Sequence, residues 1–121
     1  MDDRAEMTEA GRRRIAEFVH AALGWAGQNA QKNLAGTGRV SKATIERVKR
    51  GEDVSDTMLR ALGDVLGLPR DFLLYIGYGE VNRIERLMSE SANDPNRRDL
   101  IRWTLEHLFP NNPGHTRVQP A

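Results

Sequence analysis

The chain has 121 residues and no cysteine, and its 18 basic and 17 acidic side chains leave a net charge of +1. This length fits one domain with a core of about 80 residues and short appendages, and the lack of cysteine excludes disulfides and thiolate metal sites. The charged N-terminus lacks the apolar core of a signal peptide, and no apolar run approaches the roughly 20 residues that span a bilayer, so we expect a cytoplasmic protein with no membrane partner.

The N-terminal part of the chain is predicted to form an arm and one helix. Residues 1–8 carry few side chains that could be buried and are expected to be flexible. From about residue 9 to residue 23, apolar side chains recur at helical spacing, with Gly24 as the expected stop and Trp25 in the connection that follows. Arginines 12–14 also lie on this helix. Because three successive residues cannot share one side of a helix, we interpret them as a solvated surface.

Two short helices are predicted next, over about residues 28–37 and 41–50. Gly38 and the glycine two positions before it permit a sharp reversal between them. Ser41 is placed to cap the second helix, and Gly51 is expected to follow it in a left-handed conformation. The pattern therefore predicts a helix, a tight turn and a second helix.

The same segment carries a local excess of positive charge. Residues 30–51 hold six cations against the single anion Glu46, a net charge of +5, so the other 12 cations and 16 anions of the chain sum to −4. Ile45 and Val48 lie three positions apart and share the buried face of the second helix, which leaves the cations on its outward face. A helix held by its back with a basic front suits insertion into the major groove of DNA.

Four more helices are predicted downstream. One follows a cap at Ser55 and stops at Gly67, and Pro69 is expected to open a short fifth helix, as proline does in a first turn. Residues 80–91 then place apolar side chains on one stripe, and Asp94-Pro95 reads as a cap and first-turn proline that begin a last amphipathic helix.

The remaining sequence offers no strand. Alternating runs of β-branched or aromatic residues are absent, and residues 110–121, which are rich in proline and lack periodicity, are expected to be disordered. The predicted fold is therefore all-α, with one domain over residues 9–78 and a helical pair over residues 79–109.

Several spaced features of this chain agree with one known family. They are Gln31 opening the first short helix, Leu34-Ala35, Val40-Ser41, the buried Ile45, Gly51 after the second helix, and the closing pairs Leu66-Gly67 and Phe72-Leu73-Leu74. On these residues, the segment from about Ile15 to Ile76 resembles the helix-turn-helix domain of the lambda-type phage repressor and Cro family (XRE-like). The resemblance implies a five-helix DNA-binding domain with additional C-terminal helices, acting as a phage or prophage repressor on operator DNA in a bacterial cell or infected host.

The chain departs from the pattern of that family at three places. Arg39 stands where the family usually has the glycine of the turn, with Gly38 one place earlier, which could shift the turn by a residue. The loop after the second helix, often basic in the family, is Glu52-Asp53 here and is not expected to grip the DNA backbone. Ala43 replaces a common polar base reader, although it could pack on a thymine methyl group.

The early outward positions of the second helix are predicted to meet base edges: Lys42, Ala43, Thr44 and Arg47. Arg47 is the strongest candidate, because a bidentate contact to guanine contributes about 1–3 kcal/mol of discrimination; its alternatives are a phosphate contact or shielding of Glu46. Phosphate contacts are expected from Gln31, Ser41, Lys49 and Arg50, with Lys32 and Arg39 as further candidates. For Gln31, the alternative is a solvated polar side chain.

No cofactor, metal, small-molecule substrate or catalytic residue is expected. The histidines at positions 20, 107 and 115 are too scattered to ligate a metal, and no pair of carboxylates supplies that spacing. The two Gly-X-Gly stretches, residues 36–38 and 77–79, lack the strand context and the Lys-Ser/Thr ending of a phosphate-binding loop. We therefore predict a binding protein, not an enzyme.

A single recognition helix rarely gives enough affinity, so such domains usually pair on half-sites about 34 Å apart. The stripes of residues 80–109 could form a two-fold interface of a homodimer, or could pack on their own domain. The interface candidates are Leu87, Met88, Leu100, Trp103 and Leu108. The alternative function is an antitoxin or adaptor that uses the C-terminal helices to bind a partner protein.

Overall fold

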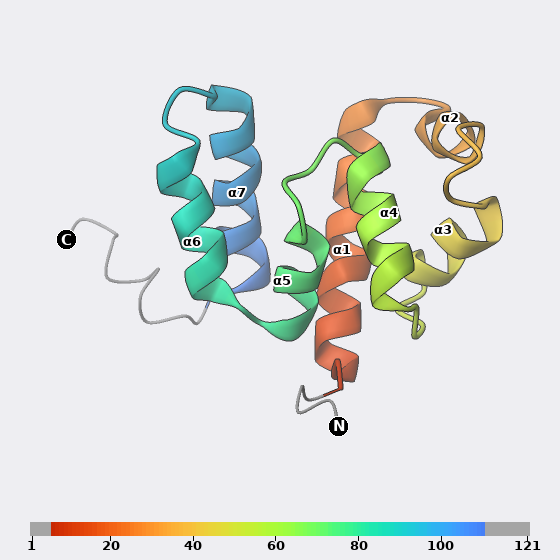
Figure 1. The fold of residues 1–121 in the computed structure, drawn as a ribbon, viewed down its shortest axis with the longest axis horizontal. Coiled ribbons are helices and arrows are strands. Elements are labelled where there is room, and N and C mark those ends of the chain that lie inside the picture. Colours follow the sequence, from red (N-terminus) through yellow and green to blue (C-terminus); the bar gives the residue numbers. More distant parts are fainter. Residues whose placement is uncertain (1–5, 111–121) are drawn as a thin grey trace. The chain divides into compact units, whose positions relative to one another are not determined.

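A computed structural model describes residues 6–110, and over this range the backbone forms seven helices and no strand (Figure 1). The predicted all-α fold is confirmed. The helices divide between two compact units, one ending at Gly79 and the other beginning at Glu80. Most of the predicted arm and tail, residues 1–5 and 111–121, lie outside the described range. Within it, none of the helices combines the length and the apolar character that a bilayer span requires.

The first helix, α1 (Glu9–Ala26), is longer than predicted. It begins after Thr8, whose Oγ1 accepts a 3.0 Å hydrogen bond from a first-turn backbone N–H. It continues through Gly24, because a glycine inside a helix costs only about 1 kcal/mol. It stops at Gly27, whose φ of 98° and ψ of −176° form a combination open essentially to glycine alone. Trp25 therefore lies inside the helix, 53% exposed, and not in the connection where it was predicted.

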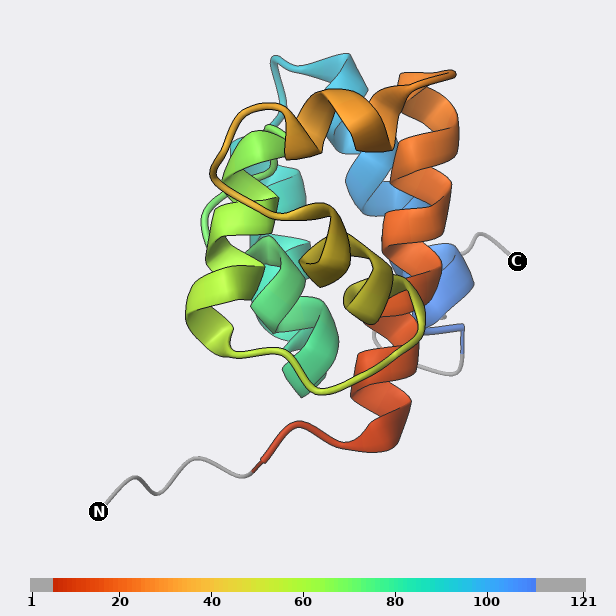
Figure 2. The ribbon, with the colours of Figure 1, turned by 90° about the vertical axis from the view of Figure 1, so that its right-hand side faces the viewer.

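Four further helices complete the N-terminal unit: α2 (Ala30–Ala35), α3 (Lys42–Lys49), α4 (Asp56–Val65) and α5 (Phe72–Tyr78). Helix α1 packs against α2, α3 and α5, and α4 packs against α5 (Figures 1 and 2). Phe18 of α1 meets Phe72 of α5 edge-on, with ring centroids 5.5 Å apart. Ile45 of α3 and Leu62 of α4 are fully buried as well. One apolar core therefore holds α3 by the face that the sequence predicted.

Helices α1 and α5 cross at two glycines. A Cβ atom added to Gly11 would lie 1.9 Å from the carbonyl oxygen of Gly77. A Cβ atom added to Gly77 would lie 2.5 Å from Met7 Cε and 2.7 Å from Ile15 Cδ1. Contacts this short do not occur between real Cβ atoms and their neighbours. At Gly11 the neighbour is backbone, so glycine at this position is what allows the two helices to approach so closely.

The helices α2 and α3 are one or two residues shorter at their ends than predicted, whereas α5 begins three residues later than expected. Pro69 does not open α5, because Asp71 adopts a left-handed φ of 63° and the N–H of Phe72 donates to the Pro69 carbonyl at 3.1 Å. Residues 69–71 therefore form a turn before the helix. Gly67, with a φ of 75°, follows α4 as the sequence predicted.

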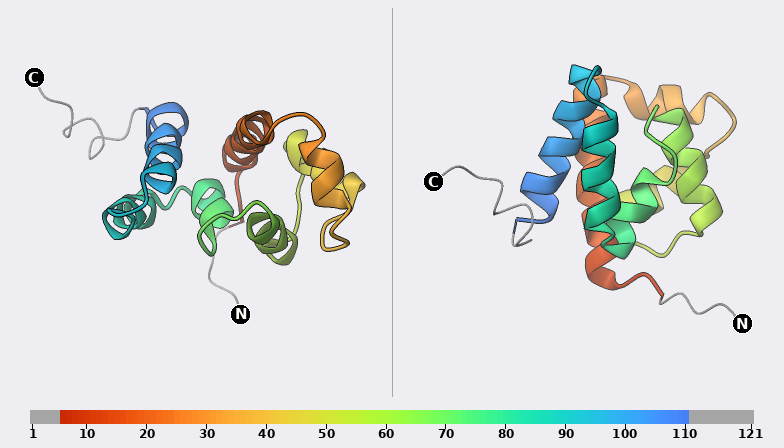
Figure 3. Two further views of the ribbon diagram at one scale, coloured as in Figure 1. Left: turned by 90° about the horizontal axis from the view of Figure 1, so that it is seen from above. Right: turned by 60° about the vertical axis from the view of Figure 1, so that its left-hand side comes forward.

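The C-terminal unit consists of α6 (Val81–Glu90) and α7 (Pro95–Leu108), which lie side by side (Figure 3). The Asp94 side chain accepts a 3.1 Å hydrogen bond from the N–H of Arg97, and Pro95 occupies the first turn, so the predicted start of this helix is confirmed. Ile84 of α6 and Ile101 of α7 are fully buried.

Candidate nucleic-acid interface

Helix α3 of the basic segment is held by its apolar side. Val40, Ile45 and Val48 are only 2%, 0% and 3% exposed. Ser41 caps the helix: its Oγ accepts a 3.0 Å hydrogen bond from the N–H of Thr44 and donates to Thr44 Oγ1, also at 3.0 Å. The predicted cap is confirmed. Because both the back and the start of α3 are fixed, its outward side chains have a defined direction.

The residues predicted to read bases differ in exposure. Lys42, Ala43 and Arg47 are exposed, whereas Thr44 is half-buried with its hydroxyl against Ser41. All four lie within six consecutive positions of one helix, so the structure brings them together. This arrangement suits contact with a few adjacent base pairs.

The turn before α3 takes its left-handed residue at Gly38, with a φ of 79°. Thr37 Oγ1 donates to the Leu34 carbonyl at 2.8 Å and accepts from the N–H of Arg39 at 3.2 Å. The Arg39 side chain reaches α4, where its Nη2 donates to Asp64 Oδ2 at 3.1 Å. Arg39 therefore needs no left-handed conformation, and its guanidinium forms an exposed ion pair with Asp64.

Gln31 of α2 and Lys49 of α3 form a network with Glu46. Gln31 Nε2 donates to Glu46 Oε2, and Lys49 Nζ donates to Gln31 Oε1 at 2.9 Å and lies 3.6 Å from Glu46 Oε2. The hydrogen bond from Gln31, and then the charge of Lys49, lower the pKa of Glu46 below its ordinary value. The Lys49 side chain is only 23% exposed. Two predicted phosphate contacts are thus tied together between α2 and α3.

Glu52, three residues beyond the end of α3, contacts two arginines. Its Oε2 accepts from Arg50 Nε at 2.5 Å, and its Oε1 lies 3.6 Å from Arg47 Nε. Arg47 Nη2 also donates to the Asp53 carbonyl at 2.7 Å. The hydrogen bond from Arg50, with a smaller contribution from Arg47, lowers the pKa of Glu52, and the same bond raises the pKa of Arg50. Arg47 therefore contacts Glu52, not Glu46.

The other cations predicted to contact bases or phosphates lie at the surface of the segment. Lys32 and Lys42 are exposed and form no salt bridge within residues 6–110. The Arg47 and Arg50 side chains are 49% and 56% exposed despite their contacts with Glu52. Exposed ion pairs of this kind are worth about 0–1 kcal/mol, so these cations can exchange their partner for a phosphate at low cost.

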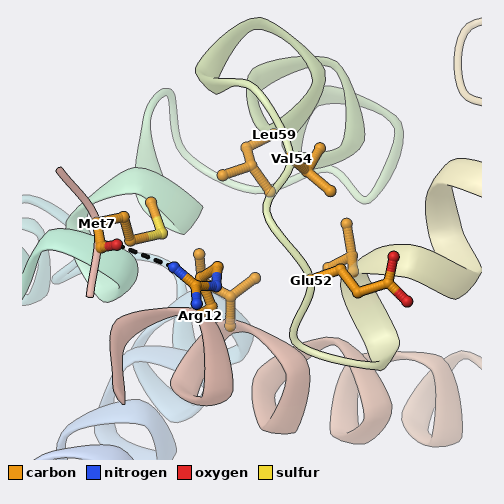
Figure 4. A pocket seen from close by; sticks show the side chains of 7 residues that line it. Met7, Arg12, Glu52, Val54 and Leu59 are labelled. Atoms are coloured by element: carbon orange, nitrogen blue, oxygen red, sulfur yellow. Dashed lines mark hydrogen bonds between the residues drawn. The ribbon is translucent and has the colours of Figure 1, made fainter. Parts of the chain in front are cut away.

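Two of the three arginines predicted to form a solvated surface instead donate hydrogen bonds to backbone carbonyls, which corrects that prediction. Arg12 Nε donates to the Gly51 carbonyl and its Nη1 to the Met7 carbonyl, both at 3.1 Å (Figure 4). Arg14 Nε donates to the Ile76 carbonyl at 3.0 Å, and burial lowers its pKa. Carbonyls near the C-terminal end of a helix favour a cation. Arg12 therefore anchors the C-terminal end of α3 to α1.

Two pockets of this unit lie beside the N-terminal end of α1, and Glu52 is among the residues that line the smaller one. One, lined by Met7, Arg12 and Val54 among others, has about 10 Å³, which is room for one water (Figure 4). Another, with Glu6 and Asp56 in its lining, has about 160 Å³, below the roughly 300 Å³ of a typical small-molecule site. Within residues 6–110, no cluster of three or more His, Asp or Glu is placed to hold a metal ion.

The predicted dimer-interface residues of the C-terminal unit fall into two groups. Leu87, Met88, Leu100 and Trp103 are half-buried, whereas Leu108 is 7% exposed and therefore offers little surface to a second chain. The Trp103 ring stacks on His107 of the next turn, with centroids 4.6 Å apart. This stacked pair gives α7 an aromatic surface with a polar edge.

Comparison of the chain with protein-family models, with curated proteins and with solved structures finds no match. The resemblance to the repressor family therefore stays a prediction from the residues named above. What the chain does must be argued from the geometry of α2, α3 and the cations around them.

Proposed function

We propose that the chain is a sequence-specific regulator of transcription that inserts α3 into the major groove of double-stranded DNA. The observation that carries this proposal is the division of α3 into two sides. Ile45 and Val48 are buried, while Lys42, Ala43 and Arg47 are exposed on a helix whose start is fixed by a cap. A rigid helix with short and basic outward side chains at its early positions fits the recognition geometry of major-groove readers.

The surrounding cations support contact with the two phosphate strands. Lys32, Arg39 and Arg50 are exposed around α3, and the N-terminal side of α2 carries Gln31. Contacts of this kind position a protein on the duplex and make its affinity fall with salt. The proposed mechanism is occupation of operator DNA, as in a phage or prophage repressor of the bacterial cytoplasm, with polymerase excluded from the site.

The proposal includes a homodimer, because one recognition helix contributes too little affinity for a stable operator complex. Two copies would place their α3 helices about 34 Å apart, one helical turn of DNA. The C-terminal unit supplies the surface for this contact through Leu87, Met88, Leu100 and Trp103.

The test is selection of binding sites from random DNA, followed by affinity measurements on Arg47→Ala at fixed salt. Loss of a bidentate guanine contact should weaken binding to the selected site by about 1–3 kcal/mol and relax the preference at one base pair. Arg86→Ala, which removes the same charge from α6, serves as the control. If no sequence is enriched, or if Arg47→Ala binds with unchanged affinity and preference, the assignment of α3 as a base-reading helix is wrong.

A further inference from the structure

An anion lies where the proposed interface needs positive charge. Glu52 lies three residues beyond the end of α3, and its carboxylate points away from Arg12 (Figure 4). It contacts Arg50 and Arg47, the two arginines assigned to phosphate and base contacts. The side chains of all three residues are about half exposed. Because the carboxylate is paired with these two arginines, its placement calls for an explanation at the interface.

We propose that Glu52 sets the affinity of the protein for DNA by acting as an internal competitor, whose carboxylate occupies Arg47 and Arg50 in the free protein. The inference rests on the proposed function. Carboxylate and phosphate oxygens bind guanidinium groups in the same way, through charge-assisted hydrogen bonds. DNA must therefore displace Glu52 before either arginine is available in full.

The position of Glu52 makes this competition persistent. Glu52 is only two positions from Arg50. After DNA phosphates have taken its place on the arginines, its negative charge therefore stays close to those phosphates. The remaining like-charge repulsion weakens binding to every sequence, since it acts on the backbone and not on a base. Glu52 thereby limits retention of the protein on non-operator DNA.

Glu46, the anion within α3 itself, has different partners from those of Glu52. Its partners are Gln31 and Lys49, and they link α2 to α3. The Lys49 side chain is less than half as exposed as that of Arg50, 23% against 56%. Glu46 therefore links α2 and α3 as part of the fold, whereas the partners of Glu52 are exposed arginines that can also bind a phosphate.

The experiment compares full-length protein with Glu52→Gln on a fluorescent random-sequence duplex of about 20 base pairs. Glutamine keeps the size of the side chain and removes its charge. We expect Glu52→Gln to bind about five- to tenfold more tightly at about 50 mM salt, and the gain to shrink at about 200 mM salt because screening weakens exposed charge pairs. Glu106→Gln makes the same charge change on α7, outside the proposed interface. It should alter affinity by less than about twofold, because salt screens a surface charge that is not at the contact.

Two further measurements separate local competition from net charge. In an Arg50→Met background, the gain from Glu52→Gln should fall, because the main partner of the carboxylate is absent. Without DNA, the Glu52 carboxyl followed by NMR should titrate at a higher pH in Arg50→Met than in the natural sequence. An equal gain in both backgrounds, or an unchanged Glu52 titration, would overturn the assignment of Glu52 to these arginines.

The outcomes also distinguish this inference from the proposed function. If the natural protein binds the duplex and Glu52→Gln binds equally well, the competitor role is wrong while DNA binding stands. If neither protein binds DNA at low salt, the proposed function fails and the inference fails with it.

Discussion

Replacement of Gly11 by alanine tests the crossing of α1 and α5, which sets the frame that carries α3. The new Cβ would lie 1.9 Å from the Gly77 carbonyl oxygen and 3.0 Å from its carbonyl carbon. Both are backbone atoms, so relief requires the helices to separate. Overpacking of a core costs about 1–3 kcal/mol, and alanine recovers about 0.5–1 kcal/mol of helix propensity. We expect a net loss of about 1–2 kcal/mol, and a fall in melting temperature of about 4–16 °C.

The assay is thermal and urea unfolding followed by circular dichroism, and the same helix supplies the control. A Cβ atom at Gly24 of α1 would meet no atom within 4 Å. Gly24→Ala should therefore stabilise the protein by about 0.5–1 kcal/mol, through helix propensity alone. The two alanine variants should move the midpoint in opposite directions. A Gly11→Ala protein as stable as the natural sequence would refute the close crossing of α1 and α5.

Three other perturbations test the remaining contacts. Arg12→Met removes hydrogen bonds to two carbonyls, including that of Gly51, and should lower the unfolding free energy in urea by about 1–2 kcal/mol. The control is Arg13→Met, at an exposed neighbouring position, which should change the unfolding free energy by less than about 0.5 kcal/mol. The pKa of Glu46 is lowered in the folded state, so the stability that its carboxylate contributes is complete above the unfolded pKa of about 4.3 and is lost as pH falls through the folded pKa. Glu46→Gln should therefore flatten the decline of the unfolding free energy below about pH 4.5. An unchanged decline would contradict the network of Gln31, Glu46 and Lys49. Trp103→Ala should shift the proposed dimer toward monomer in sedimentation velocity, and an unaltered dimer would place the interface elsewhere.

Local signals in the sequence predicted the local structure well. The caps at Ser41 and Asp94 and the left-handed glycines Gly51 and Gly67 each depend on a few neighbouring residues, and each is where the pattern placed it. The stop at Gly24 was wrong for a local reason too. A glycine only weakens a helix, and the chain reverses where it needs a conformation that glycine alone adopts, three residues later.

Contacts between distant residues could not be predicted in the same way. Arg12 and Arg14 flank the buried side of α1, but their partners are carbonyls 39 and 62 positions away, which no periodicity indicates. The close approach of Gly11 and Gly77 is equally invisible in the chain, because it depends on the crossing of two helices. For the candidate interface, the positions of the cations on and around α3 could be predicted from the sequence, but the pairing of Arg47 and Arg50 with Glu52 could not.

Contacts with the rest of the fold limit the conformational freedom of α3, which bears on its proposed role in reading bases. Its C-terminal end is fixed to α1 through Arg12, and its start is fixed by the Ser41 cap and the buried Val40. A helix fixed at both ends loses little conformational freedom on binding, so less of its interaction energy is spent on ordering. The adjustable part is then the charge of the side chains, and Glu52 is the residue proposed to change it through Arg47 and Arg50. On this proposal, affinity and geometry are set by different residues, so that one can be altered by mutation while the other is preserved.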